Sequence, residues 1–286
     1  MRRSLLLLAL AAATLPASAF AQKAPRYTFT SFDVPGSTST RGFDVNNAGM
    51  IVGDFVDVAG VTHGYFRSGG SFTQVDVPGS VGTGFWGVND FGVGVGRYDI
   101  NPNFAEAHGF VYDGTTFTSV DAPGATWTVA RGINNAGTVV GCYIDVAGRN
   151  HGFLLSGGQF TAIDYPNASF TQCSGINNNG QVVGEYRDAA GKYHGFLLSG
   201  GRFTSIDFPK AIDTRAYKIN LSGQVVGHYQ LANGVYHGFL LSGGTYTTVD
   251  YPNATYSSAN GISDAGEIVG RRDDATGKTH GFYAAK

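Results

Sequence analysis

A segment of about 43 residues recurs six times in this 286-residue chain, and this repetition constrains the fold more than any other feature. The clearest copy contains Gly-Ile-Asn-Asn-Asn-Gly at 175–180, Val-Val-Gly at 182–184 and His-Gly-Phe at 194–196. A period between about 20 and 50 residues is typical of solenoids, propellers and other repeat arrays. The spacing leaves no room for a separate domain, because its only irregularity is a two-residue insertion between Gly96 and His108. The His-Gly pairs begin at His63, His108, His151, His194, His237 and His280.

Each copy predicts four short antiparallel strands. In the third copy, a first strand ends at the turn 135–137, and further strands are predicted at 138–144, 152–155 and 159–164. These segments are rich in β-branched and aromatic residues and are separated by Asn, Asp and Gly, which favour turns. No segment has the apolar spacing of a helix. Four strands joined by tight hairpins are the pattern of a propeller blade.

The two ends of the repeat array are out of phase with each other. Residues 27–33 resemble the fourth strand of a repeat, whereas the chain ends just after a third strand that contains 281–283. We therefore predict that these two segments pair, because closing the ring removes exposed strand edges. The predicted fold is an all-β, six-bladed β-propeller with four antiparallel strands per blade, whose last blade is closed by the N-terminal strand.

The N-terminal segment has the features of a secretory signal peptide. Arg2 and Arg3 precede a short apolar run at 5–10, and Ala19-Phe20-Ala21 matches a cleavage site. The apolar run is too short to span a bilayer. The sequence thus predicts a signal peptide at 1–21, a single propeller domain at 22–286, and export to the periplasm or the cell exterior without a membrane span.

Composition argues against a nucleic-acid partner. Charged residues make up 14% of the chain, and removal of Arg2 and Arg3 with the signal peptide changes the net charge from −2 to −4. Phosphate binding requires clustered Lys and Arg, and no such cluster occurs. The two cysteines, Cys142 and Cys173, suggest a disulfide in an exported protein, with two buried free thiols as the alternative.

The combined motifs resemble the HAF-repeat family of extracellular bacterial repeat proteins, named for a His-Ala-Phe at the start of the third strand. Here Gly replaces Ala, and the first copy has His63-Gly-Tyr. The resemblance covers nearly all of 27–286. It implies an exported bacterial protein with a repeat fold, and it brings no catalytic residues.

The repeated histidines are interpreted as structural. A residue present once in every blade would be spread around a ring, whereas the ligands of one metal ion must converge. We expect each histidine to form a buried hydrogen bond with the aspartate of the Asp-x-Pro motif. The Asp-x-x-Gly segments are interpreted as hairpin turns rather than calcium ligands. The sequence therefore predicts no metal and no cofactor.

Candidate ligand-binding positions are those at which the copies differ. The hairpin between the first two strands predicts cross-strand pairs that vary between copies. A second variable column lies two residues further along the first strand, and it faces the channel if this strand is innermost. The predicted pairs are Arg41–Asp54, Gly84–Arg97, Val129–Cys142, Gln172–Glu185, Arg215–His228 and Ser258–Arg271. The second column comprises Phe43, Trp86, Arg131, Ser174, Tyr217 and Asn260.

These columns predict a ligand-binding site at one mouth of the channel, with neutral variation on a solvated face as the alternative. Aromatic rings beside Arg and carboxylates suit carbohydrate recognition. The leading interpretation is a non-catalytic, exported domain that binds a glycan, peptide or cell-surface partner. One alternative is a hydrolase or lyase acting on an extracellular polymer, for which His228 beside Glu185 and Arg215 could supply acid–base chemistry. The other alternative is a scaffold without a small ligand. The sequence contains no recognised catalytic motif. The candidate residues are Arg41, Trp86, Trp127, Arg131, Glu185, Arg215, Tyr217 and His228.

Overall fold

The computed structural model describes residues 27–101 and 106–286, so the predicted signal peptide at 1–21 lies outside the described residues. Every regular element in the described part of the chain is a β-strand, and none of it forms a helix long and apolar enough to cross a membrane. The strands form two four-stranded and two eight-stranded sheets. A single parallel residue pair divides each eight-stranded sheet into two four-stranded units, Thr62 with Gly82 in one sheet and Asn150 with Phe170 in the other.

The units are numbered here in chain order. Unit 1 comprises β2 (Ser39–Val45), β3 (Ile51–Val56), β4 (Thr62–Ser68) and β5 (Ser71–Gln74), and unit 2 comprises β6 (Gly82–Val88), β7 (Gly94–Asp99), β8 (Ala107–Tyr112) and β9 (Phe117–Val120). Unit 3 comprises β10 (Trp127–Ile133), β11 (Val139–Ile144), β12 (Asn150–Ser156) and β13 (Gln159–Ile163), and unit 4 comprises β14 (Phe170–Ile176), β15 (Val182–Arg187), β16 (Tyr193–Ser199) and β17 (Arg202–Ile206). Unit 5 comprises β18 (Asp213–Ile219), β19 (Val225–Gln230), β20 (Tyr236–Ser242) and β21 (Thr245–Thr248). Unit 6 comprises β22 (Tyr256–Ile262), β23 (Ile268–Asp273), β24 (Thr279–Ala285) and β1 (Thr28–Phe32).

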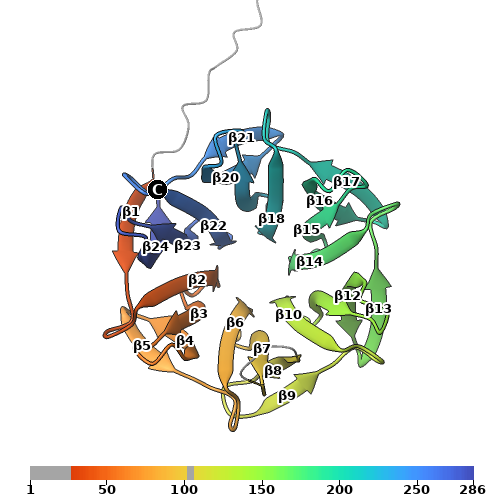
Figure 1. The fold of residues 1–286 in the computed structure, drawn as a ribbon, viewed down its shortest axis with the longest axis horizontal. Coiled ribbons are helices and arrows are strands. Elements are labelled where there is room, and N and C mark those ends of the chain that lie inside the picture. Colours follow the sequence, from red (N-terminus) through yellow and green to blue (C-terminus); the bar gives the residue numbers. More distant parts are fainter. Residues whose placement is uncertain (1–26, 102–105) are drawn as a thin grey trace, which may run out of the picture.

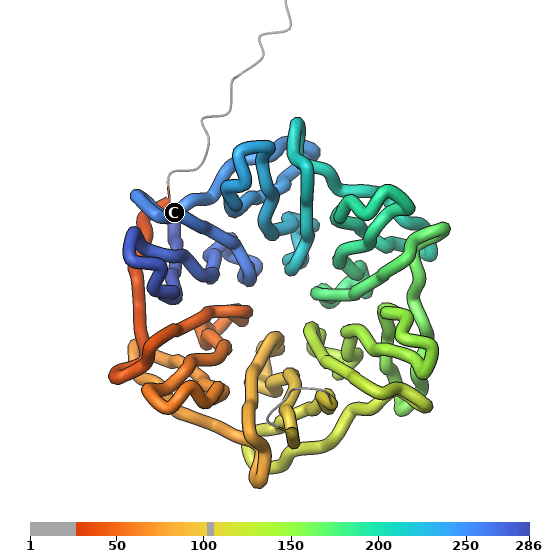
Figure 2. The backbone as a smooth tube through the Cα atoms, viewed as in Figure 1, coloured from red at the N-terminus to blue at the C-terminus, as the bar shows by residue number. Residues whose placement is uncertain are grey.

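The units surround a central axis. Figure 1 shows the first strand of each unit (β2, β6, β10, β14, β18 and β22) nearest the centre. The tube in Figure 2 passes from one unit to the next in sequence order. The all-β propeller fold predicted from the repeat is therefore confirmed.

The N-terminal strand belongs to the same sheet as the C-terminal strand. β1 pairs antiparallel with β24, and Phe32 lies opposite Gly281. Figure 2 shows this junction as the red end of the tube beside the blue end. The predicted pairing of 27–33 with the strand containing 281–283 is confirmed.

The aromatic residue of each His-Gly-Phe motif forms the centre of a unit. All six of these rings are completely buried, and each packs over a glycine of the second strand. In unit 3, a Cβ added at Gly141 would lie 2.8 Å from the Phe153 ring and 2.0 Å from the Val129 carbonyl oxygen. Only glycine fits at such a position, which explains the Val-Val-Gly motif. The six rings belong to Tyr65, Phe110, Phe153, Phe196, Phe239 and Phe282.

The repeated histidines bind the Asp-x-Pro aspartates, as predicted. Each histidine Nδ1 lies 2.6–3.0 Å from an aspartate oxygen, and the pair His280–Asp33 joins the two ends of the chain. The histidine side chains are 12–32% exposed, so these contacts are partly exposed rather than buried. In four units the Asp-x-x-Gly turn adds a second carboxylate 3.1–3.4 Å from Nε2, a contact not predicted from the sequence.

The substitution His151→Ala is expected to lower the free energy of unfolding by about 1–2 kcal/mol, because a hydrogen bond to a charged group contributes about 1.5–3 kcal/mol and partial exposure reduces that contribution. His151 contacts Asp164 at 2.9 Å and Asp145 at 3.3 Å, and it stacks on Tyr143. Urea denaturation would measure the change, with Arg149→Ala, an exposed position in the same unit, as the control. Stoichiometric zinc or copper in the purified protein that is lost with His151→Ala would contradict the structural assignment.

Candidate functional site

The innermost strand of every unit contains a β-bulge at the second variable column. In β2 the register with β3 shifts between Gly42 and Asp44, so Phe43 is the extra residue, and the other five units repeat this arrangement. A bulge re-aims the side chain of its extra residue and interrupts the ladder locally. All six predicted cross-strand pairs, from Arg41–Asp54 to Ser258–Arg271, are confirmed.

The six bulge residues line a single cavity of about 230 Å³, which we call the bulge cavity. Its remaining walls come from the first strands and from one residue of β23. These bulge residues are six different amino acids, so the cavity has no rotational symmetry in its chemistry. Its lining consists of Arg41, Phe43, Trp86, Arg131, Ser174, Tyr217, Lys218, Tyr256, Ser258, Asn260 and Arg271.

Four of the eight candidate residues line this cavity, namely Arg41, Trp86, Arg131 and Tyr217. The structure does not place the other four among its lining residues. Trp127 is the first residue of β10, where it pairs with Ile144. Its counterpart in unit 6, Tyr256, does reach the cavity, so this column contributes from some units and not from others.

Glu185 and Arg215 form an ion pair behind the cavity wall. Their closest atoms are 3.5 Å apart, and Glu185 is 3% exposed. Burial raises the pKa of the Glu185 carboxyl, partly offset by Arg215 and Arg131. Arg215 also donates to Asp213 at 3.2 and 3.3 Å and lies 4.0 Å over the Tyr193 ring.

His228 is buried behind two tyrosines that line the cavity. Its Nδ1 lies 3.2 Å from both the Tyr217 and the Tyr256 hydroxyl groups. Arg271 donates to the Tyr256 hydroxyl at 2.9 Å, which leaves that hydroxyl to donate to His228. Burial, with Arg215 and Arg271 nearby, holds the pKa of His228 well below 6.5. A neutral imidazole in this place orients the tyrosine rings rather than facing the cavity.

Trp86 is the centre of an aromatic and cationic wall. The Arg131 guanidinium lies 3.8 Å above its ring, and Phe43 packs against it with ring centroids 5.5 Å apart. Stacking on the indole ring fixes the plane of the guanidinium. The N–H groups lie in that plane and stay available to a hydrogen-bond acceptor beside the indole ring. The wall thus presents a flat apolar surface beside a positive charge.

A buried ion pair forms the floor of the bulge cavity. The Lys218 ammonium donates to Asp44 at 2.9 Å and to the carbonyl oxygens of Trp86 and Arg131 at 2.9 and 2.8 Å. Asp44 also accepts hydrogen bonds from the Val45 and Val88 amides. Burial raises the pKa of Asp44 and lowers that of Lys218, and each partner offsets the effect on the other.

Sequence reasoning missed this pair, although the repeat contained a signal for it. The other four units have glycine at the equivalent position, because the first strands approach each other closely there. A Cβ at Gly87 would lie 2.8 Å from the Arg131 carbonyl oxygen, and one at Gly175 would lie 2.6 Å from the Tyr217 carbonyl oxygen. Asp44 and Lys218 are the exceptions in an otherwise invariant column, and their opposite charges indicated a pair.

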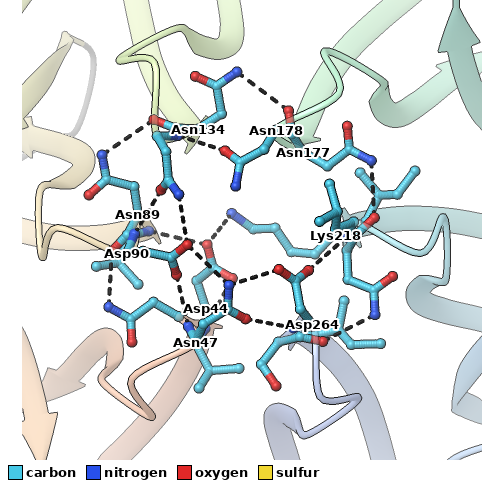
Figure 3. Close-up of a pocket in the computed structure, with 18 of the residues that line it drawn as sticks. Asp44, Asn47, Asn89, Asp90, Asn134, Asn177, Asn178, Lys218 and Asp264 are labelled. Atoms are coloured by element: carbon cyan, nitrogen blue, oxygen red, sulfur yellow. Dashed lines mark hydrogen bonds and ion pairs between the residues drawn. The ribbon is translucent and has the colours of Figure 1, made fainter.

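On the other side of this floor, the hairpins between first and second strands form a shallow polar depression, shown in Figure 3. The first Asn of each Gly-Ile-Asn-Asn motif connects one unit to the next, as when Asn46 Nδ2 donates to the Asn89 carbonyl oxygen at 2.9 Å. Unit 6 has Ser263 instead, and there the Asp264 amide donates to Asn47 at 2.8 Å. These amides are occupied by contacts between units, so they are structural.

Both cysteines are buried free thiols in the structure, the alternative to the disulfide considered above. Cys142 donates to the Gln172 side chain at 3.3 Å. Burial raises the pKa of both thiols. Neither thiol lines the bulge cavity. Among residues 27–101 and 106–286, no group of three or more His, Cys, Asp or Glu side chains is arranged to hold a metal ion.

Comparison with known proteins supports the fold. No protein-family model matches the sequence, and no curated protein matches it. Among solved structures, the six-bladed fucose-binding lectin of Aleuria aurantia is similar, with a TM-score of 0.52 and 13% identity over 90% of this chain and 91% of the lectin. The SapL1 lectin, solved with α-methyl fucoside, has a TM-score of 0.56 and 10% identity over 87% of this chain and 94% of that chain. TolB from Acinetobacter baumannii has a TM-score of 0.58 and 11% identity over 88% of this chain and 65% of TolB. At these identities the likeness shows a propeller fold alone.

Proposed function

We propose that this protein is an exported, non-catalytic, six-bladed propeller that binds a carbohydrate in the bulge cavity. One observation carries the proposal: the bulge residues of the six units are six different amino acids, and all six line one cavity. A ligand without sixfold symmetry requires such variation, whereas conservation of the repeat gives no reason for it.

The chemistry of the lining favours a sugar. Sugars present apolar C–H faces and a rim of hydroxyl groups, which suit aromatic rings beside polar side chains. Trp86, Phe43 and the two tyrosines supply the rings, and Ser174 adds a hydroxyl. The similar lectins support this choice, since the Aleuria aurantia lectin recognises fucose and SapL1 was solved in complex with α-methyl fucoside.

A closed ring of six blades is consistent with the contacts between its ends. β1 completes unit 6, His280 binds Asp33, and Asp264 contacts Asn47 across the junction of units 6 and 1. Such closure would hold the six bulges at fixed distances from one another. The bulge cavity would then be a preformed site, which lowers the entropic cost of binding.

The ionisable side chains of the cavity favour binding without catalysis over hydrolysis. The described lining residues include no carboxylate and no imidazole. Glu185 and His228, the pair that the sequence offered for acid–base chemistry, are 3% and 6% exposed and lie behind the wall. Hydrolysis of a glycosidic bond normally needs two carboxyl groups facing the substrate.

Export to the periplasm or the cell exterior of a bacterium is part of the same proposal. It is supported by the signal-peptide pattern at 1–21 and by the resemblance to HAF repeats. N-terminal sequencing of protein recovered outside the cytoplasm should begin at Gln22. Recovery of the protein only in the cytoplasm with Met1 retained would contradict it.

The substitution Trp86→Ala is expected to reduce glycan affinity about tenfold or more, because truncation of an aromatic anchor in a binding site costs about 2 kcal/mol or more. A glycan array screened with the mature protein would first identify bound sugars, and calorimetry would then compare the variant. The matched control is Phe91→Ala, since Phe91 is 74% exposed and lies in the hairpin turn between β6 and β7, away from the bulge cavity. Equal affinity of Trp86→Ala and the parent, or an array without any bound glycan, would contradict the proposed function.

A further inference from the structure

The charges of the bulge cavity are not balanced. Four of its described lining residues are cationic, Arg41, Arg131, Lys218 and Arg271, and none is acidic. A guanidinium donates hydrogen bonds to the hydroxyl groups of any sugar, and its charge in addition attracts an anionic group. The excess therefore bears on which class of saccharide the site accepts.

Two of the four cations are neutralised by carboxylates outside the lining. Arg41 forms a bidentate pair with Asp54, with N–O distances of 2.6 and 2.9 Å. Lys218 pairs with Asp44 at 2.9 Å. These contacts account for the structural roles of Arg41 and Lys218.

Arg131 and Arg271 have no such partner. Within the described residues, neither guanidinium lies within 4.0 Å of a carboxylate. The Nε of Arg131 is buried without a hydrogen-bond partner, and the guanidinium is stacked 3.8 Å from Trp86. Arg271 is stacked 4.6 Å from the Tyr256 ring and donates one hydrogen bond, to the Tyr256 hydroxyl. Both guanidinium groups therefore stack on aromatic rings, and neither forms an ion pair in direct contact with a carboxylate.

An arginine held in this way is suited to an anionic group of a ligand. A guanidinium presents parallel N–H groups that match the oxygens of a carboxylate or sulfate, and charge-assisted hydrogen bonds are about twice as strong as neutral ones. Glu185 is close enough to Arg131 to interact with its charge, but its ion-pair contact is with Arg215 at 3.5 Å. The cavity volume of about 230 Å³ lies below the ~300–1,000 Å³ of most ligand pockets, which fits one sugar residue of a longer chain.

We propose that the bulge cavity binds an acidic saccharide, whose carboxylate or sulfate groups contact the unpaired guanidinium groups of Arg131 and Arg271 while a sugar ring contacts the aromatic side chains. This inference rests on the proposed carbohydrate-binding function and specifies its ligand class. Because the ligand supplies the missing negative charge, affinity should fall as salt concentration rises.

Calorimetry on the mature protein would test this inference with four probes: a galacturonate oligosaccharide, its methyl ester, a sulfated galactose oligosaccharide and inorganic sulfate. We expect the first or the third to bind, which identifies the anionic group, and the methyl ester to bind at least about tenfold more weakly than the galacturonate, a difference of 1.4 kcal/mol. Arg131→Gln and Arg271→Gln should each reduce the affinity for the acidic sugar at least about tenfold. Arg149→Gln, at an exposed position, is the matched control, and thermal melts would establish that each variant is folded.

The outcomes separate this inference from the proposed function. Binding of neutral oligosaccharides or of the methyl ester as tightly as the acidic sugar would overturn the inference and leave carbohydrate binding intact. If inorganic sulfate binds as tightly as the sulfated oligosaccharide, the inference that the cavity recognises a saccharide is overturned. Failure of every saccharide on a broad array to bind would overturn both. If Arg131→Gln does not fold, Arg131→Lys, which keeps the charge but not the planar donor group, should still show the weakened affinity.

Discussion

Deletion of residues 22–34 is expected to lower the melting temperature of the protein by about 10 °C or more, because 1 kcal/mol corresponds to roughly 2–4 °C in a domain of this size. The deletion removes β1 and with it every backbone pair to β24. It also removes the buried ring of Phe32, and burial of a phenylalanine alone contributes about 3–5 kcal/mol. The His280–Asp33 contact is lost as well.

Two variants would separate loss of the strand from loss of chain length. Deletion of residues 22–26 alone leaves β1 in place and should melt like the parent. A permuted chain that carries 27–33 after Lys286, joined by a Ser-Gly-Gly turn as in units 1, 3, 4 and 5, should recover most of the lost stability, since β1 would then follow β24 as an ordinary hairpin. Circular dichroism melts would measure all three, and an unchanged melting temperature after deletion of 22–34 would show that the ends do not hold each other.

The architecture was predictable from this sequence because the same turn and strand signals recur in six copies of the repeat. The motif Gly-Ile-Asn-Asn-x-Gly fixes a hairpin, and the hairpin fixes which residues lie opposite each other, so Arg215 was correctly paired with His228. The variable column was recognised by comparison of the copies. Its physical basis, a bulge that turns each of these side chains toward the axis, became visible only in the structure.

The set of residues that line the site was predicted less well, because the pairing of two strands does not determine which neighbouring side chains cover a given residue. Glu185 and His228 share the column of Arg271, yet they are buried behind the wall while Arg271 lines the cavity. The difference comes from the residues packed over them, Arg215 for Glu185 and the two tyrosines for His228. Contacts between different units are not encoded in any one repeat, and the pair Lys218–Asp44 spans 174 residues.

The cavity floor depends on that same pair, and its stability effect should be among the largest of any single substitution. Lys218→Met is expected to lower the free energy of unfolding by about 3–5 kcal/mol, because removal of one partner leaves the other charge buried without compensation. Asp44 would keep only its amide donors, and the carbonyl oxygens of Trp86 and Arg131 would lose their shared donor. Urea denaturation at neutral pH would measure the loss.

The pH dependence of this loss identifies its cause. Burial already raises the pKa of Asp44 in the folded protein, and removal of the Lys218 ammonium raises it further. Between the pKa of Asp44 in the unfolded chain and its higher pKa in the folded variant, the folded state binds more protons, so the stability of Lys218→Met should increase as the pH falls. The double variant Asp44→Asn/Lys218→Met contains neither charge. Its free energy of unfolding should be higher than that of Lys218→Met at pH 8, and the difference between the two variants should be smaller at pH 5. An equal difference in the free energy of unfolding at both pH values would mean that Lys218→Met loses stability through altered packing rather than through the unpaired carboxylate of Asp44.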